Sequence, residues 1–171
     1  MKLIILNGPP GVGKSTISKL LHADMPNSVL LDIDEIRRSV PDYKERRAES
    51  LQISYQKAAE TVGHHLKLGQ DVIIDKAISQ SETVDSLIEA GRAHGADVYE
   101  FLLFADKYTV QKRADERGYR PGSLLTRERV GEMWEKADAL KKERLGSVLI
   151  DTSNMSVEEL VGKIKTAISF S

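Results

Sequence analysis

Eight residues near the N-terminus, GPPGVGKS (Gly8–Ser15), have the types and spacing of a phosphate-binding loop. An apolar run precedes them and a helical pattern follows, as the Walker A motif requires. Glycines let backbone N–H groups turn inward toward an anion. Because Pro9 and Pro10 have no N–H, the donors must come mainly from Gly11 through Thr16. The predicted nucleotide-binding residues of this loop are Gly8, Gly11, Val12, Gly13, Lys14, Ser15 and Thr16.

Two side chains of the loop have predicted roles of their own. We expect Lys14 to reach the β- and γ-phosphates of ATP and the Ser15 hydroxyl to ligate Mg²⁺. The alternative is a chance glycine-rich turn, but a full match of this motif is rare at average residue usage. The sequence therefore predicts ATP and Mg²⁺ as cofactors.

A second group of charged residues follows the second apolar run, in the stretch LLDIDEIRR. An enzyme that transfers phosphate to a hydroxyl needs a carboxylate to orient or deprotonate the acceptor. Asp34 is the candidate base. Asp32 is its main rival. Arg37, one helical turn further, and Arg38 are candidates for holding an anionic acceptor or the transferring phosphoryl group. A solvated charge cluster at a strand end is the alternative.

The stretch DVIID, which ends at Asp75, has the shape of a Walker B strand. Asp75 is a candidate for assisting Mg²⁺ or for contacting the acceptor, and both readings stay open. The third interpretation is that Asp75 has a structural role and caps the next loop. Lys76 beside it is a weaker candidate for acceptor contact.

A positive segment lies further along, with six Lys or Arg and three Asp or Glu between Lys112 and Arg129. Arg113 and Arg117 are four residues apart, so they share one face of a helix. A positive flap punctuated by Gly and Pro is suited to close over phosphates and to exclude water. We expect Arg113 and Arg117 to contact the nucleotide, with Arg117 the favoured catalytic residue; ordinary surface charges are the alternative.

Short apolar runs alternate with amphipathic stretches and must position these groups. Ser15–Asp24 and Tyr43–Leu68 have helical length, and Gly69 suits the position after a helix. Ser79–Glu82 and Ser156–Glu159 match the capping box. This alternation predicts an α/β fold with a five-stranded parallel sheet. The expected strands are Leu3–Leu6, Val29–Ile33, Val72–Asp75, Val98–Phe104 and Val148–Asp151.

The totals limit the class of protein. The 171 residues fit one domain, 1–171, with the Arg-rich lid at roughly 112–130. The net charge of −1 argues against extended nucleic-acid binding, and the absence of cysteine excludes disulfides and thiolate chemistry. The sequence offers no apolar stretch long enough for a membrane span or a signal peptide. We expect a cytoplasmic monomer or small homo-oligomer with no membrane partner.

Three classes of P-loop protein compete. The Asn-Lys-x-Asp tetrapeptide of guanine-specific switches is absent, and a motor ATPase or AAA-type module normally needs more chain than this. GPPGVGKST with DEIR resembles the P-loop kinases that include phage polynucleotide kinase, zeta toxins and chloramphenicol phosphotransferase. The resemblance implies that Asp34 is the general base and that Arg37 stabilises the transition state. It also implies a lid role for Arg113 and Arg117, and its specific motifs cover about twenty residues.

These observations predict a three-layer P-loop NTPase fold that transfers the γ-phosphoryl group of ATP to a hydroxyl. The acceptor is a small molecule, a nucleoside or nucleotide, or an oligonucleotide end. Asp34, Arg37, Arg38 and Asp75 are the predicted acceptor-site residues, and Asn154, after the last apolar run, is predicted to flank the adenine. The rival from another class is a nucleotide-binding regulatory ATPase without an acceptor.

Overall fold

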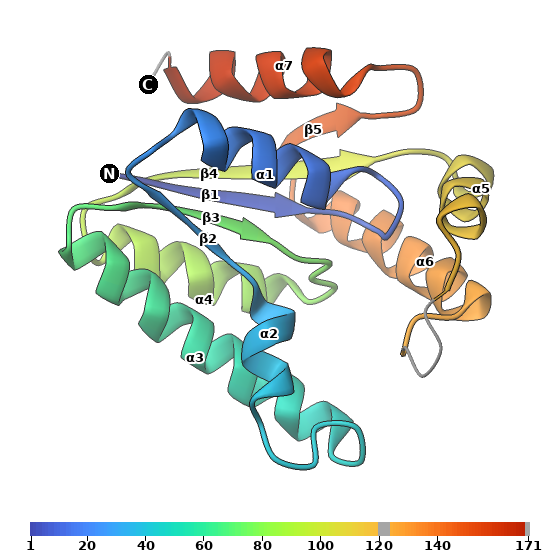
Figure 1. Cartoon of the computed structure of the whole chain (residues 1–171), viewed down its shortest axis with the longest axis horizontal. Helices are drawn as coiled ribbons and strands as arrows, with labels where there is room; N and C mark the ends of the chain where they lie inside the picture. The colour runs from blue at the N-terminus through green and yellow to red at the C-terminus, as the bar shows by residue number, and fades with distance from the viewer. Residues whose placement is uncertain (120–123, 170–171) are drawn as a thin grey trace.

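A parallel sheet of five strands organises the chain, with helices on both of its faces (Figure 1). The computed structural model describes residues 1–119 and 124–169. Each of the five apolar runs forms a strand, and the strand order is β2-β3-β1-β4-β5, so the expected parallel sheet is confirmed. The strands are β1 (Lys2–Asn7), β2 (Ser28–Leu31), β3 (Asp71–Asp75), β4 (Asp97–Phe104) and β5 (Val148–Asp151).

The central strand β1 shows why the runs are apolar throughout. Leu3 and Ile5 pack into one hydrophobic cluster, and Ile4 and Leu6 pack into a second one on the other face of the sheet. All four side chains are fully buried. Because alternate residues of a strand point to opposite faces, a strand covered on both sides needs an apolar residue at every position.

Two layers of helices supply these covers (Figure 1). Helices α1 and α7 pack on one face, and α3 and α4 pack on the other. Helix α6 lies beside α4 in Figure 1, and Val130 near its start joins the cluster of α1 and α7. None of the helices in the described ranges is both long enough and apolar enough to cross a membrane. The helices are α1 (Lys14–Asp24), α2 (Ile33–Arg38), α3 (Arg47–Lys67), α4 (Ser81–Arg92), α5 (Lys107–Arg117), α6 (Arg127–Glu143) and α7 (Val157–Ser169).

Three local predictions differ from the structure. The second strand, expected at Val29–Ile33, ends at Leu31, because Asp32 caps α2 and Ile33 begins that helix. The helix expected from Tyr43 begins at Arg47, because residues 41–46 form turns in which Asp42 has a φ of 53°. The capping box at Ser79–Glu82 is wrong: Gln80 precedes α4, and no side chain caps the helix. Its neighbour Ser81 instead accepts a hydrogen bond from Arg144, 3.1 Å away, so a tertiary contact replaces the local one.

Two other predictions about where helices begin and end are confirmed. At the start of α7, the Ser156 N–H donates to Glu159 Oε2 at 2.7 Å, and the Glu159 N–H donates to Ser156 Oγ at 3.2 Å. These are the two reciprocal bonds of a capping box. Gly69 follows α3 with a φ of 75°, the left-handed conformation that glycine adopts without strain.

Parallel strands bring all the chemistry to one edge of the sheet. The phosphate-binding loop follows β1, Asp32 follows β2, Lys76 follows β3, and the segment that leads into α7 follows β5. Ligands of open α/β sheets bind outside this carboxyl edge. The fold therefore gathers the charged residues that the sequence analysis selected from four separate segments.

Candidate active site

The loop between β1 and α1 needs glycine at two positions for close packing. A Cβ on Gly8 would lie 2.1 Å from the carbonyl oxygen of Leu103 in β4, and one on Gly11 would lie 2.9 Å from the carbonyl oxygen of Val110 in α5. Both glycines also have positive φ, at 143° and 88°. The loop is thus held against the end of β4 and against α5. A backbone fixed in this way can present preorganised N–H groups to an anion.

Lys14 lies in the floor of this phosphate cradle, which comprises Gly8–Ser15. Its ammonium group donates to the Pro9 carbonyl oxygen at 2.9 Å, and the residue is 8% exposed. The pKa of Lys14 is lowered to about 8, mainly by burial; the charges of Lys76 and Arg117 act in the same direction as burial, and the charges of Asp75 and Asp34 oppose the shift. A buried cation surrounded by further cations forms a field that favours a bound anion.

The first turn of α1 presents Ser15 and Thr16, both exposed, next to the cradle. Val12 instead places its side chain in the core, where it is 1% exposed, so its predicted contact with phosphate rests on its backbone. Gly13 is the N-cap of α1, and its carbonyl oxygen accepts hydrogen bonds from the N–H groups of Thr16 and Ile17 at 3.0 Å. The positive end of α1 therefore faces the place where the phosphates are expected.

Asp75 ends β3 and lies beside α1. The Ser18 hydroxyl, one turn after Ser15, is 3.4 Å from Asp75 Oδ2 and 3.3 Å from the Ser15 carbonyl oxygen. A hydroxyl and a carboxylate supply the hard oxygen ligands that Mg²⁺ prefers, and Mg²⁺ takes its remaining ligands from phosphates and water. Ser15 and Asp75 therefore fit the ion that the sequence predicts.

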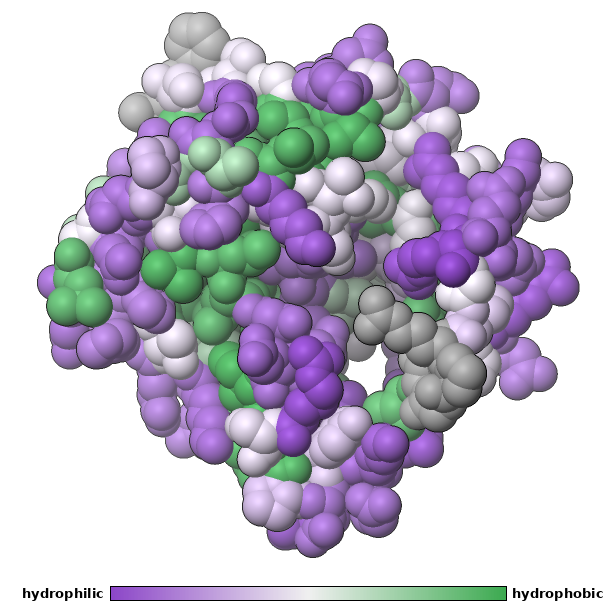
Figure 2. Space-filling view, viewed as in Figure 1, coloured by the Kyte–Doolittle hydropathy of each residue, from purple (hydrophilic) through white to green (hydrophobic). Residues whose placement is uncertain are grey.

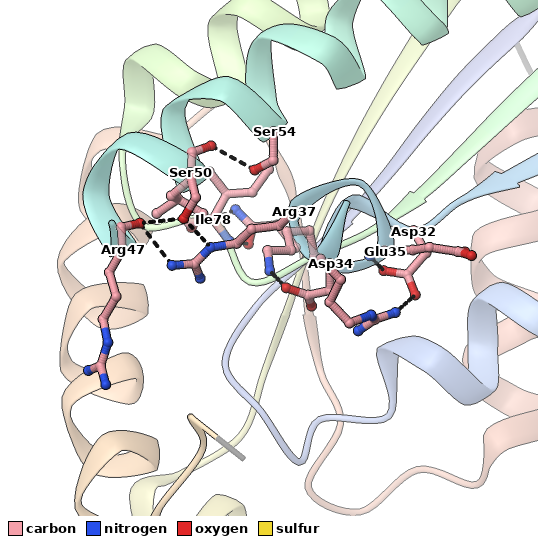
Figure 3. Close-up of polar contacts among 12 residues, drawn as sticks. Asp32, Asp34, Glu35, Arg37, Arg47, Ser50, Ser54 and Ile78 are labelled. Atoms are coloured by element: carbon pink, nitrogen blue, oxygen red, sulfur yellow. Dashed lines mark hydrogen bonds and ion pairs between the residues drawn. The ribbon is translucent and has the colours of Figure 1, made fainter. Parts of the chain in front are cut away.

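On the acceptor side, the two aspartates after β2 have different partners (Figure 3). Asp32 caps α2: its Oδ1 accepts the Glu35 N–H at 3.0 Å, and its Oδ2 lies 3.4 Å from Arg38. Asp34 forms an ion pair with Lys76, which comes from the end of β3. The side chain of Lys76 is 12% exposed and that of Asp34 is 53% exposed. Asp34 is therefore the carboxylate linked to the segment after β3, whereas Asp32 has a structural role in starting α2.

Arg37 points away from Asp34 toward the start of α3 (Figure 3). Its Nε donates to Ser50 Oγ at 3.2 Å, and a terminal nitrogen donates to the Arg47 carbonyl oxygen at 2.8 Å. Tyr55, further along α3, has its pKa raised by burial and by the charge of Asp34. The structure thus pairs Asp34 with Lys76 and uses the Arg37 guanidinium to hold the start of α3.

The two lid arginines of α5 also differ. Arg113 donates to the carbonyl oxygens of Thr152 and Ser153 at 2.9 and 3.1 Å, so it holds the segment between β5 and α7. Asn154, the predicted adenine neighbour, lies next in that segment and is exposed. Arg117 is exposed, and its charge helps to lower the pKa of Lys14. Residues 120–123 of the predicted lid lie outside the described residues.

Asn7 is a site residue that the sequence analysis did not select. It is 1% exposed, and its Oδ1 accepts the N–H groups of Gly8 and Ile78 at 2.7 and 2.8 Å. A buried polar residue immediately before the motif was the signal for it. Because Asn7 contacts both the cradle and the segment after β3, it fixes the phosphate side of the site relative to the acceptor side.

The surface beside α2 is hollowed on the side that faces α5 and α6 (Figure 2).

The layered sheet, the cradle, the carboxylate after β2 and the arginines of α5 together define a P-loop kinase domain. A sequence profile described as an AAA domain matches residues 3–140, and the chain belongs to this family. The length of 171 residues, which we expected to argue against an AAA-type module, therefore does not exclude a family with this description. The family and the fold make nucleotide binding a property of the chain.

Three comparisons place the chain among its relatives. A putative adenylate kinase of Methanocaldococcus jannaschii is 29% identical over 168 residues, which cover 96% of this chain and 85% of the relative. The tunicamycin resistance protein of Deinococcus radiodurans has a similar fold, with a TM-score of 0.71, 18% identity and coverage of 99% and 96%. A chain of the Pnkp1/Rnl/Hen1 RNA repair complex has a TM-score of 0.66 and 23% identity, with coverage of 83% of this chain and 45% of that one.

Proposed function

We propose that this chain transfers the γ-phosphoryl group of ATP to a hydroxyl of a small molecule, a nucleoside or nucleotide, or an oligonucleotide end. The observation that carries the proposal is the position of Asp34. Its carboxylate is paired with Lys76, and the Lys76 N–H is bonded to the Leu6 carbonyl oxygen of β1, just before the cradle. A half-exposed carboxylate held in this position can accept the proton of an attacking hydroxyl.

The residues divide the reaction between them. Backbone N–H groups from Gly11 onward and the Lys14 ammonium hold the β- and γ-phosphates. Asp34 accepts the acceptor's proton as the new O–P bond forms and the bond from the γ-phosphorus to ADP breaks. Arg117 covers the phosphates from the lid and excludes water. Mg²⁺, when held by Ser15 and Asp75, neutralises phosphate charge. A single domain, a cytoplasmic location and a monomeric or small oligomeric state belong to the same proposal.

An acceptor panel tests the function. The panel contains deoxyadenosine for nucleosides, gluconate for sugar acids, tunicamycin, an RNA with a 5′-hydroxyl, and AMP. Mass spectrometry detects the gain of one phosphate, and a coupled assay measures ADP. We expect one class of hydroxyl to stimulate ADP formation and to gain the phosphate. If ATP binds but no compound stimulates turnover, the regulatory ATPase is the better description.

Two matched variants test the base. Asp34→Asn keeps the shape of the side chain but removes its basicity, so we expect kcat to fall by roughly 10²- to 10⁴-fold, the usual contribution of general acid–base catalysis. ATP binding should be retained. Asp32→Asn preserves an acceptable helix cap and should change kcat by less than about threefold. Equal losses in the two variants would contradict the assignment of the base to Asp34.

The relatives named putative adenylate kinases favour a second candidate, in which the acceptor is the phosphate of a nucleoside monophosphate. A phosphate oxygen is already ionised at neutral pH and needs no base. In that case AMP is the stimulating compound, and Asp34→Asn retains most of the activity. The same panel and the same variant therefore separate the two candidates.

A further inference from the structure

The acceptor side of the site needs a cation for the transferring phosphoryl group. Arg37, which the sequence predicts for this role, is engaged elsewhere. Phosphoryl transfer relies on positive groups around the charge that develops on the transferring group. Arg37 has the expected spacing, but its guanidinium makes two hydrogen bonds at the start of α3. Arg38 pairs with Asp32, and both of these side chains are more than half exposed.

Lys76 lies where such a cation is needed. Its ammonium pairs with Asp34, the candidate base, and its charge lowers the pKa of Lys14. One cation therefore acts on both the acceptor's base and the phosphate-binding lysine. Its side chain is only 12% exposed, so solvent screens its charge less than it would screen that of a surface lysine.

The backbone of Lys76 is also fixed relative to the cradle. Its N–H donates to the Leu6 carbonyl oxygen of β1 at 3.2 Å. Two residues later, Ile78 exchanges hydrogen bonds of 2.8 and 3.1 Å with the Asn7 side chain. These three bonds attach the segment 76–78 to the residues immediately before the motif. A cation mounted on a rigid segment is preorganised, because it pays little reorganisation cost during the reaction.

We infer that Lys76 is the acceptor-side catalytic cation of this chain, which holds the Asp34 carboxylate at the cradle and contacts the phosphoryl group during transfer. This inference rests on the proposed function. As the acceptor's O–H bond breaks, its proton goes to Asp34. The acceptor oxygen bonds to phosphorus, and ADP leaves with the electron pair of the broken bond. Lys76 takes no part in the proton transfer, and its ammonium group balances the negative charge of the carboxylate and of the transferring group.

The decisive variants are Lys76→Met, which keeps the apolar stem, and Lys76→Arg, which keeps the charge. We expect Lys76→Met to lower kcat about 100-fold with the panel compound that the wild-type chain phosphorylates, with the KM for ATP changed by less than about threefold. The kcat of Lys76→Arg should be at least about tenfold higher than that of Lys76→Met. Lys165→Met is the matched control, because Lys165 makes another Lys–Asp ion pair, with Asp24, between α7 and α1. It should leave kcat unchanged.

Binding of ADP with aluminium fluoride and MgCl₂ gives a second readout that needs no acceptor. The fluoride complex imitates the transferring phosphoryl group, so its affinity relative to ADP alone reports on the groups that contact it. We expect Lys76→Met to reduce this ratio by about tenfold or more, and Arg37→Met to reduce it by less than about threefold. Affinity for ADP alone should be unaffected by Lys76→Met.

Separate outcomes decide the inference and the function. A wild-type chain that phosphorylates no compound of the panel overturns the proposed function, while the fluoride ratio still decides the role of Lys76. The inference is overturned if Lys76→Met keeps the wild-type ratio and kcat, or if the wild-type chain binds the fluoride complex no more tightly than ADP. It is also overturned if Arg37→Met shows the larger loss or if Lys76→Arg recovers nothing.

Discussion

Asn7 and Ile78 form two buried hydrogen bonds that connect the end of β1 to the segment after β3. Asn7 Oδ1 accepts the Ile78 N–H at 2.8 Å, and Asn7 Nδ2 donates to the Ile78 carbonyl oxygen at 3.1 Å. The same Oδ1 accepts the Gly8 N–H at 2.7 Å. One amide side chain therefore satisfies three backbone groups that would otherwise be buried without partners. The distance between the phosphate cradle and Lys76 depends on this side chain.

Replacement of this amide should therefore cost stability. In Asn7→Ala the N–H groups of Gly8 and Ile78 lose their acceptor, and unsatisfied buried groups cost about 1–3 kcal/mol each. We expect the free energy of unfolding in urea to fall by roughly 2–5 kcal/mol. The control is Asn27→Ala, which removes an exposed hydrogen bond of 2.8 Å to the Gly69 carbonyl oxygen and should cost less than about 1 kcal/mol. Similar losses in both variants would show that the buried hydrogen bonds of Asn7 stabilise the fold no more than the exposed bond of Asn27.

Features set by neighbouring residues could be predicted from the sequence. The five strands follow from short apolar runs, and the cradle follows from glycines at fixed spacing. The Ser156 capping box is confirmed because both of its partners lie within one turn of helix. In each case the pattern and the contact that it predicts involve residues close together in the chain.

The destinations of long side chains could not be predicted in the same way. The spacing of Arg113 and Arg117 predicts a shared helical face, but it does not show that Arg113 holds carbonyl oxygens 39 and 40 residues away. Arg144 is a second example, because it pairs with Glu100 of β4 at 2.7 Å and also with Asp85 of α4. Such partners are brought together by the packed sheet and helices, which a one-dimensional pattern does not encode.

The contacts of Arg113 predict a specific kinetic effect. Arg113→Met frees the carbonyl oxygens of Thr152 and Ser153, so the segment before Asn154 should lose its fixed position. Because that segment is expected to flank the adenine, the KM for ATP should rise about tenfold, while kcat changes by less than about threefold. Steady-state kinetics with ATP varied would measure both constants.

The control for this variant is Arg92→Met, which removes an exposed arginine at the end of α4. Hydrogen exchange supplies the structural readout, since the amides of residues 152–154 should exchange faster in Arg113→Met and not in the control. A fall in kcat with an unchanged KM would contradict this role. That result would instead support the direct contact with the nucleotide that the sequence predicts for Arg113.

The protonation of Lys14 makes the site sensitive to pH. Burial lowers the pKa of Lys14 to about 8 from its ordinary value of 10.5. Between these two values the unfolded chain binds more protons than the folded one, so the free energy of unfolding contributed by Lys14 increases as the pH rises through this window. Below about pH 8 the folded protein carries the full cost of a buried ammonium. Bound phosphates offset this cost, because their negative charge favours the protonated form.

ATP binding should therefore take up protons near the pKa of Lys14. At pH 8 about half of the Lys14 side chains are neutral in the free protein, so binding should take up as much as about half a proton. At pH 6.5 the uptake should approach zero, because Lys14 is already charged. Calorimetry in two buffers of different ionisation enthalpy measures the uptake. Lys14→Arg, which stays charged at both pH values, should abolish the difference; an equal uptake in that variant would assign the proton to another group.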